Sequence, residues 1–210
     1  MKWFLITARR VAIVFGFVCA LGISSGAVAQ TSGASQFIGN LGNEAIKVLA
    51  LRDIALDVRE ARFRGLLANG FDLNFISRFV LGRFWREASP EQRSTYQQLF
   101  TEYVLRVYSS RLGGYAGESL NIVAERAAGK KDVMISTQID RPSGPPIRAE
   151  WRVRNKNGTY RIIDVMVEGV SMAATQRSEF ASVIKRNGID GLIHLLDVRT
   201  NKVSATTAAR

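Results

Sequence analysis

A change in hydrophobic period constrains the fold of this chain more than any other feature. Between residues 120 and 167, apolar side chains recur at every second position in three consecutive segments, with Thr137 as the one exception. These segments are 120–124, 133–139 and 147–153. A fourth segment, 160–167, is apolar at six of its eight positions, so both of its faces need dry surroundings. Turn residues separate the segments, and Asn157-Gly158 is typical of a two-residue hairpin. We therefore predict a four-stranded antiparallel meander.

Helical patterns flank the strands on both sides. Before the strands, apolar residues recur at helical spacing in the segments 36–51, 57–69, 73–84 and 90–112. Residues 89–92 (Ser-Pro-Glu-Gln) place a serine N-cap, a proline and a capping-box glutamine at the start of the fourth helix. After the strands, Ser171 and Asp190 are expected to cap two more helices, separated at Asn187-Gly188. This order predicts an α+β fold in which N- and C-terminal helices cover the sheet.

The first 29 residues have the layout of a cleavable secretory signal peptide. Basic residues precede an apolar run at 11–23, and an Ala-Val-Ala sequence follows at 27–29. The run is shorter than a typical membrane span, and a retained anchor helix is the alternative. We predict cleavage before Gln30 and export to the periplasm, by either the Sec or the twin-arginine route. A single domain at 30–199 and a flexible tail at 200–210 would then follow.

The charge and cysteine content of the exported chain narrow its partners. Removal of the signal peptide lowers the formal charge from +11 to +8 and removes Cys19, the only cysteine. Disulfides, thiol chemistry and cysteine metal sites are thereby excluded. In an exported protein, a positive charge favours anionic lipid surfaces or an acidic protein over nucleic acid. A solvated basic surface without a partner is the alternative.

Signs of catalysis are absent from the sequence. His194 is the only histidine and lies among leucines, and the chain has no nucleophile elbow and no phosphate-binding loop. Asp164 is a lone carboxylate in an apolar strand, so it must be paired with an arginine or hydrogen-bonded to a backbone donor. We predict a protein that is not an enzyme and that has no metal and no cofactor.

The remaining feature is the amount of apolar surface. The strands and the aromatic helices direct more than a dozen large apolar side chains towards one interior. That interior is either a densely packed core or the wall of a cavity. Hydrophobic periodicity does not distinguish these two possibilities.

Seven short motifs occur in a characteristic order between residues 70 and 192. They are Gly-Phe-Asp-Leu at 70–73, Ser-Arg-Phe-Val-Leu-Gly-Arg-Phe-Trp at 77–85, Ala-Ser-Pro-Glu-Gln-Arg at 88–93, Phe-Thr-Glu-Tyr at 100–103, Asp-Val-Met-Val-Glu-Gly-Val-Ser at 164–171, Arg-Ser-Glu-Phe at 177–180 and Gly-Ile-Asp-Gly-Leu at 188–192. The ordered set resembles the MlaC family, also called the toluene-tolerance auxiliary family, of periplasmic phospholipid shuttle proteins. Some relatives are associated with hopanoids.

The resemblance implies that helices pack over the antiparallel sheet and that an apolar cavity between them encloses phospholipid acyl chains. Twelve inward-facing apolar positions are the expected lipid contacts. They are Phe75, Phe79, Tyr103, Val107, Val133, Ile135, Ile147, Ala149, Trp151, Ile163, Val165 and Val167.

The resemblance also implies a role in lipid transport. A monomeric carrier would move phospholipid, as cargo and not as a cofactor, between an outer-membrane lipoprotein complex and an inner-membrane ABC transporter complex with an MCE subunit. This role would maintain the lipid asymmetry of the outer membrane. Candidate contacts for phosphate or partner carboxylates are Arg59, Arg62, Arg64, Arg83 and Arg86. The alternatives are a hopanoid-related carrier, an exported protein-interaction module with a plain core, and an NTF2-like enzyme.

Overall fold

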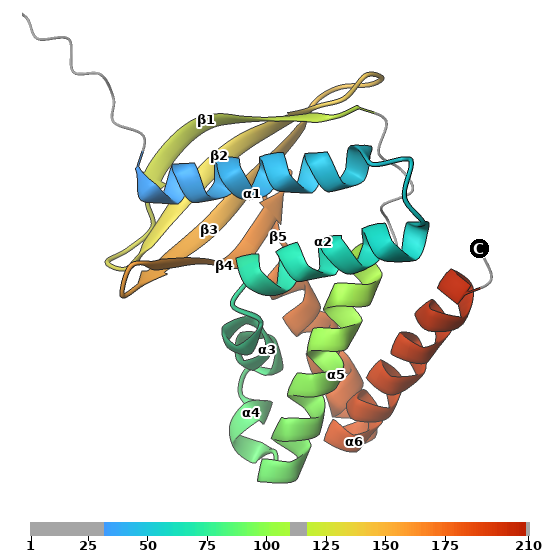
Figure 1. The fold of residues 1–210 in the computed structure, drawn as a ribbon. Helices are drawn as coiled ribbons and strands as arrows, with labels where there is room; N and C mark the ends of the chain where they lie inside the picture. The colour runs from blue at the N-terminus through green and yellow to red at the C-terminus, as the bar shows by residue number, and fades with distance from the viewer. Residues whose placement is uncertain (1–31, 110–116, 209–210) are drawn as a thin grey trace, which may run out of the picture. The chain divides into compact units, whose positions relative to one another are not determined.

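The computed structural model of the protein describes residues 32–109 and 117–208, with side chains described as far as residue 201. The predicted signal peptide and the predicted end of the fourth helix at residue 112 lie outside the described residues. Helices α1 to α5 precede the sheet and the long helix α6 follows it (Figure 1). The predicted α+β order is confirmed.

The sheet is an antiparallel meander, as predicted, but within the described residues it has five strands and not four. Its strands are paired in chain order. They are β1 (Ser119–Ala127), β2 (Asp132–Asp140), β3 (Ile147–Lys156), β4 (Thr159–Val167) and β5 (Val170–Ser171). The extra strand, β5, forms because Glu168 and Gly169 adopt positive φ angles of 47° and 80° and turn the chain back on β4. Asn157 and Gly158 also have positive φ, in keeping with the predicted hairpin.

Strand register collects the apolar residues on one face of the sheet. Ile135, Trp151 and Val165 lie opposite one another on β2, β3 and β4, and so share a face. A bulge in β4 leaves Ile163 without an opposite residue on β3. The predicted inward-facing positions of β2 and β3 therefore lie opposite one another along the whole pair of strands. In β4 the bulge interrupts this pattern at the middle of the strand.

Helix α1 (Gly33–Ala50) lies across this apolar face (Figure 1). Ala34 and Ile38 pack with Ile135, Val153 and Ile162 into one apolar cluster, which we call the sheet core. The N-terminal end of the helix approaches the sheet closely. A Cβ atom at residue 33, now a glycine, would lie 2.4 Å from the Tyr160 hydroxyl oxygen.

The remaining helices build a second apolar cluster, the helical core, around Tyr96, Phe100 and Phe180. These three rings make pairwise contacts with centroid distances of 5.7–6.4 Å. The Tyr96 hydroxyl donates a hydrogen bond to the Ser77 carbonyl oxygen at 3.0 Å, so its burial leaves no polar atom unpaired. The contributing helices are α3 (Leu73–Leu81), α4 (Phe84–Glu87), α5 (Pro90–Ser109) and α6 (Met172–Ala208).

Local capping confirms the predicted helix starts at Ser89 and Ser171. At the start of α5, the Gln92 backbone N–H donates to the Ser89 hydroxyl, and the Ser89 backbone N–H donates to the Gln92 side chain. At the start of α6, the Ala174 backbone N–H donates to the Ser171 hydroxyl. Helix α6 is kinked at Gly188, where φ is 71°, so it comprises the two helices that the sequence predicts. Its second part continues to Ala208, past the predicted start of the tail.

Helix α2 (Leu56–Gly70) follows α1 in the chain and leads to α3, and so links the sheet core to the helical core along the sequence. Beyond its end, Phe71 forms a parallel bridge with Ile162, and the Asp72 backbone N–H donates to the Ile162 carbonyl at 2.9 Å. This junction joins the helical part of the chain to the free edge of β4.

Candidate functional site

A cavity of about 930 Å³ lies between the sheet and the helices. Thirty of the described residues line it, and twenty-four of these are apolar or aromatic. Most of the apolar lining side chains are only half-buried, because they face the cavity and not other side chains. Protein interiors contain few voids larger than a water molecule. A space of this size is therefore a binding cavity and not a packing defect.

Strands β1 to β4 form one wall of the cavity. Its lining residues are Leu120, Ile139, Trp151, Val165 and Val167. The Trp151 indole N–H donates to the Thr137 hydroxyl at 2.9 Å, and that hydroxyl donates to the Ala149 carbonyl at 3.1 Å. The polar atom of the indole is thereby satisfied within the sheet, so the ring can present carbon atoms to the cavity.

Helices form the facing walls. On α5, Phe100, Tyr103, Val104, Val107 and Tyr108 recur every three or four residues and so face the cavity together. The same spacing applies to the two N-terminal helices. Their lining side chains are Ile38, Leu41, Ala45, Ile46 and Leu49 on α1, and Phe63, Leu66 and Leu67 on α2.

Five lining residues are polar, and none of the described lining residues is a lysine or an arginine. The five are Glu118, Ser119, Asp164, Gln176 and Glu179. Asp164 accepts hydrogen bonds from the Ser171 hydroxyl at 2.6 Å and from the Ala173 backbone N–H at 3.1 Å. This confirms that Asp164 is hydrogen-bonded, by a backbone donor and a serine. The cavity has no cation among its described lining to attract an anionic group inwards.

The cavity brings together five of the twelve predicted contact residues, which are Tyr103, Val107, Trp151, Val165 and Val167. Their contact with a lipid stays a prediction. The other seven do not line the cavity. Val133 and Ile135 pack against α1 in the sheet core, because that helix covers their end of the apolar face. Ala149 is buried, and Ile147 is half-buried at the first position of β3.

The remaining three of these seven residues are directed elsewhere. Ile163 is buried at the bulge, which removes it from the alternation of β4. Phe75 and Phe79 lie beside guanidinium groups, with the Cζ atoms of Arg154 and Arg177 at 4.5 Å and 5.2 Å from the two ring centroids. Cation–π contacts with residues distant in sequence therefore hold these two rings outside the cavity.

The lining residues of α1 and α2 were absent from the predicted contacts. The apolar stripe of α1 is visible in the sequence at Leu41, Ala45, Ile46 and Leu49. Periodicity shows which side of a helix is apolar, but not whether that side meets a core or a cavity. Only the position of α1 over the sheet resolves this. The first turns of the helix meet the sheet core through Ala34 and Ile38, and from Ile38 onwards its apolar side also lines the cavity.

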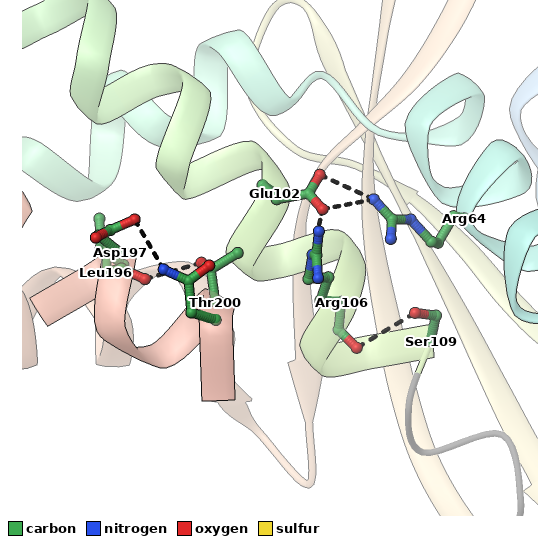
Figure 2. A network of polar contacts seen from close by, with 8 residues as sticks. Arg64, Glu102, Arg106, Ser109, Leu196, Asp197 and Thr200 are labelled. Atoms are coloured by element: carbon green, nitrogen blue, oxygen red, sulfur yellow. Dashed lines mark hydrogen bonds and ion pairs between the residues drawn. The ribbon is translucent and has the colours of Figure 1, made fainter. Parts of the chain in front are cut away.

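None of the five arginine candidates lines the cavity. Arg64 of α2 donates to both carboxylate oxygens of Glu102 on α5, each at 2.8 Å, and Arg106 donates to the same carboxylate (Figure 2). Burial alone would raise the pKa of Glu102, but the hydrogen bonds from Arg106 and Arg64 outweigh it and hold the pKa below its usual value. Arg83 lies over the Phe84 ring at 4.8 Å.

Polar chemistry is sparse in the part of the chain that the structure describes. His194 is exposed on α6. Within residues 32–109 and 117–208, no three histidine, cysteine or acidic side chains are grouped as metal ligands. No described helix is long and apolar enough to cross a membrane. The site therefore offers enclosure in an apolar space as its main interaction.

The fold and the cavity define a class of small α+β binding protein, in which helices and an antiparallel sheet enclose a ligand space. The sequence model of the MlaC protein family matches residues 40–198. This match covers well over half of the chain, so the chain belongs to the MlaC family. The family resemblance is confirmed, and with it the prediction that the chain is not an enzyme.

Two curated relatives support the assignment. The intermembrane phospholipid transport system binding protein MlaC of Haemophilus influenzae is 29% identical over 126 residues, which are 58% of this chain and 59% of that protein. The toluene tolerance protein ttg2D of Pseudomonas putida is 23% identical over 120 residues, which are 57% of this chain and 56% of that protein. The chain thus spans less than two thirds of the length of either relative.

A solved structure shows the same fold. The phospholipid-binding protein from Ralstonia solanacearum, in complex with a phospholipid, superimposes with a TM-score of 0.72 at 23% sequence identity. The similarity covers 82% of this chain and 99% of that protein. The predicted fold class is confirmed by this likeness.

Proposed function

We propose that this protein is a periplasmic carrier that binds phospholipid by enclosing its acyl chains and moves lipid between complexes in the outer and inner membranes. One observation carries the proposal: a cavity of about 930 Å³ that is apolar at twenty-four of its thirty described lining positions. A protein-interaction module with a plain core would not retain such a space. An NTF2-like enzyme would need more polar side chains directed inwards.

The cavity volume matches the hydrocarbon of a membrane lipid. A methylene group occupies about the volume of a water molecule in the liquid, roughly 30 Å³. A cavity of about 930 Å³ therefore accommodates roughly thirty methylene groups. This number corresponds to the two acyl chains of one ordinary diacyl phospholipid.

Burial of hydrocarbon is sufficient for tight binding. Each buried methylene contributes about 0.8 kcal/mol, so a single chain of about fourteen methylenes contributes roughly 11 kcal/mol. The half-buried side chains that line the cavity gain as well, because the acyl chains remove their carbon atoms from water. Affinity then depends little on the headgroup, and a broad headgroup preference is expected.

The headgroup is expected to remain at the cavity entrance. The described lining has no lysine or arginine, and its charged members are Glu118, Asp164 and Glu179. An anionic phosphate would lose its hydration in such a space without gaining a cationic partner. The phosphate therefore stays in water while the acyl chains are enclosed.

Localisation and partners follow from the family and the sequence. The Haemophilus relative is a binding protein of an intermembrane phospholipid transport system, which supports carriage between two membranes. The predicted signal peptide supports a periplasmic location. The expected partners are an outer-membrane lipoprotein complex and an inner-membrane MCE and ABC transporter complex, and no nucleic acid.

Lipid extraction and liposome uptake test the proposal. Protein exported to the periplasm is purified without detergent, extracted, and its lipids separated by thin-layer chromatography beside phospholipid and hopanoid standards. Delipidated protein is then incubated with liposomes of phosphatidylethanolamine and phosphatidylglycerol. We expect co-purified phospholipid and uptake of about one molecule per protein. Co-purified hopanoid without phospholipid would show that the cargo is a hopanoid. A lack of both co-purified lipid and liposome uptake would reject the proposed carrier function.

A further inference from the structure

Helix α2 is the most weakly held wall of the cavity. Gly70 is the only buried residue among its fifteen. No side chain caps its N-terminus, where Ala55 is the N-cap residue. By contrast, α1 is anchored by Ala34 and Ile38 in the sheet core, and α5 by aromatic residues in the helical core.

The attachment of α2 is concentrated at its C-terminal end. Gly70 lies against Leu41, since a Cβ atom at residue 70 would be 2.8 Å from a Leu41 methyl group. The next two residues, Phe71 and Asp72, are tied to Ile162 at the sheet edge. The C-terminal end is therefore a pivot about which the rest of the helix could swing.

A buried polar atom near the other end favours such a movement. The Nε atom of Arg59 is buried and has no hydrogen-bond partner among the described residues, although its Nη1 atom donates to the Leu51 carbonyl. A buried N–H group without a partner disfavours the closed position of the helix. Outward movement of this end of α2 would expose the group to water.

A charged contact closes the seam between α2 and α5 from the outside. The Nη2 atom of Arg64 on α2 donates to both carboxylate oxygens of Glu102 on α5, and Arg106 of α5 donates to the same carboxylate (Figure 2). Among the described residues, this is the ion pair that joins α2 to another helix. The side chains of Arg64 and Glu102 are about a third exposed, at 32% and 30%.

The inner side of the same seam is apolar. Leu66 and Leu67 of α2 and Tyr103 of α5 face the cavity. Glu102, the residue before Tyr103, does not line the cavity. An acyl chain passing between the two helices would therefore meet carbon atoms along its path, once the outer ion pair had opened.

We propose that the acyl chains enter and leave through the seam between α2 and α5, and that Arg64 and Glu102 are the positioning pair that keeps this portal closed. This inference rests on the proposed lipid-carrier function. A partly exposed ion pair suits a reversible closure because water and counter-ions can replace each half of it at low cost. A buried apolar contact would hold the seam more firmly and would slow release.

Charge-neutralising variants give the first test. Glu102→Gln removes the ion pair with almost no change in size, and Arg64→Gln removes it with the loss of two heavy atoms. Protein loaded with a fluorescent phosphatidylglycerol is mixed with acceptor liposomes, and the transfer rate is followed. We expect each variant to transfer about three- to fivefold faster, which corresponds to the loss of one such ion pair, with unchanged lipid per protein. The matched control is Glu150→Gln, which removes an ion pair on the sheet whose glutamate side chain is exposed to a similar degree, 28%, and it should leave the rate unchanged.

Cross-linking gives the second test. The predicted mature chain has no cysteine, so the double variant Arg64→Cys/Glu102→Cys can be bridged by a short bis-maleimide. We expect loaded, bridged protein to retain its lipid and to transfer it at least about tenfold more slowly than the same variant blocked with a monofunctional maleimide. The same bridge in the double variant Arg126→Cys/Glu150→Cys, across the sheet, should not slow transfer.

The outcomes separate the portal from the carrier function. If the α2–α5 bridge leaves the transfer rate unchanged while the protein still binds lipid, the portal lies elsewhere and the carrier function stands. If Glu150→Gln speeds transfer as much as Glu102→Gln does, the effect is a general loss of stability. This result would overturn the role of Arg64 and Glu102 at the portal. If no variant, nor the original protein, takes up lipid, the proposed function itself fails.

Discussion

Filling the cavity from the sheet should weaken lipid binding and reduce lipid loading without unfolding the protein. Val165 lines the cavity from β4 and is only half-buried, so there is space in front of its side chain. A tryptophan at this position adds seven heavy atoms, which displace roughly seven methylene groups of an acyl chain. At about 0.8 kcal/mol for each methylene, binding weakens by up to about 6 kcal/mol. Shifts of the lipid reduce this loss, but the affinity should still fall by more than about tenfold.

Loading and stability must be measured on the same sample. Phospholipid per folded Val165→Trp protein is determined by native mass spectrometry after incubation with liposomes, and urea unfolding of the lipid-free protein gives its free energy of unfolding. The matched control is Ile135→Val, a fully buried sheet-core position outside the cavity. It should lower the free energy of unfolding by about 0.5–1.5 kcal/mol and leave loading unchanged. Equal loading of Val165→Trp and the original protein would refute the assignment of the cavity as the lipid site.

Two further predictions concern stability. Gly33→Ala should lower the free energy of unfolding by about 1–3 kcal/mol, because the new Cβ would meet Tyr160 at 2.4 Å. Gly65→Ala, with open space around the residue, should instead raise the free energy of unfolding by up to about 1 kcal/mol. Urea titrations that find Gly33→Ala more stable than Gly65→Ala would contradict the packing of α1. Burial would raise the pKa of Asp132, but hydrogen bonds from its two arginine partners hold that pKa below its usual value. The ionised Asp132 carboxylate therefore stabilises the fold fully above a pH of about 4. This stabilisation is lost as the pH falls through the lowered pKa. The difference in unfolding free energy between the original protein and Asp132→Asn should therefore shrink in acid, and a pH-independent difference would argue against this ion cluster.

Features determined by local sequence were predictable. The capping box at Ser89 and Gln92, the hairpin at Asn157 and Gly158, and the kink at Gly188 each depend on a few neighbouring residues. Alternation along β2 and β3 likewise reports one apolar face of a sheet. These elements fix the fold class before any tertiary contact is known.

Features determined by tertiary contacts were not predictable. Ile135 and Val165 share one face of the sheet, yet α1 covers the first and leaves the second beside the cavity. Phe79 has the periodicity of a core residue, but Arg177, from a helix almost a hundred residues away, stacks beside it at the surface. Strand β5 has only two residues, too few for an alternation to be recognised.

The central claim is that acyl chains occupy the space between the sheet, α1, α2 and α5. Photolabelling with a phosphatidylglycerol that carries a diazirine near the end of one acyl chain tests this claim most directly. Peptide mass spectrometry should locate the label on lining residues such as Leu41, Phe63, Tyr103 or Val167, and excess unlabelled phospholipid should suppress it. Labelling confined to the outer surface around Phe75 and Phe79, or no protein labelling at all, would contradict the account.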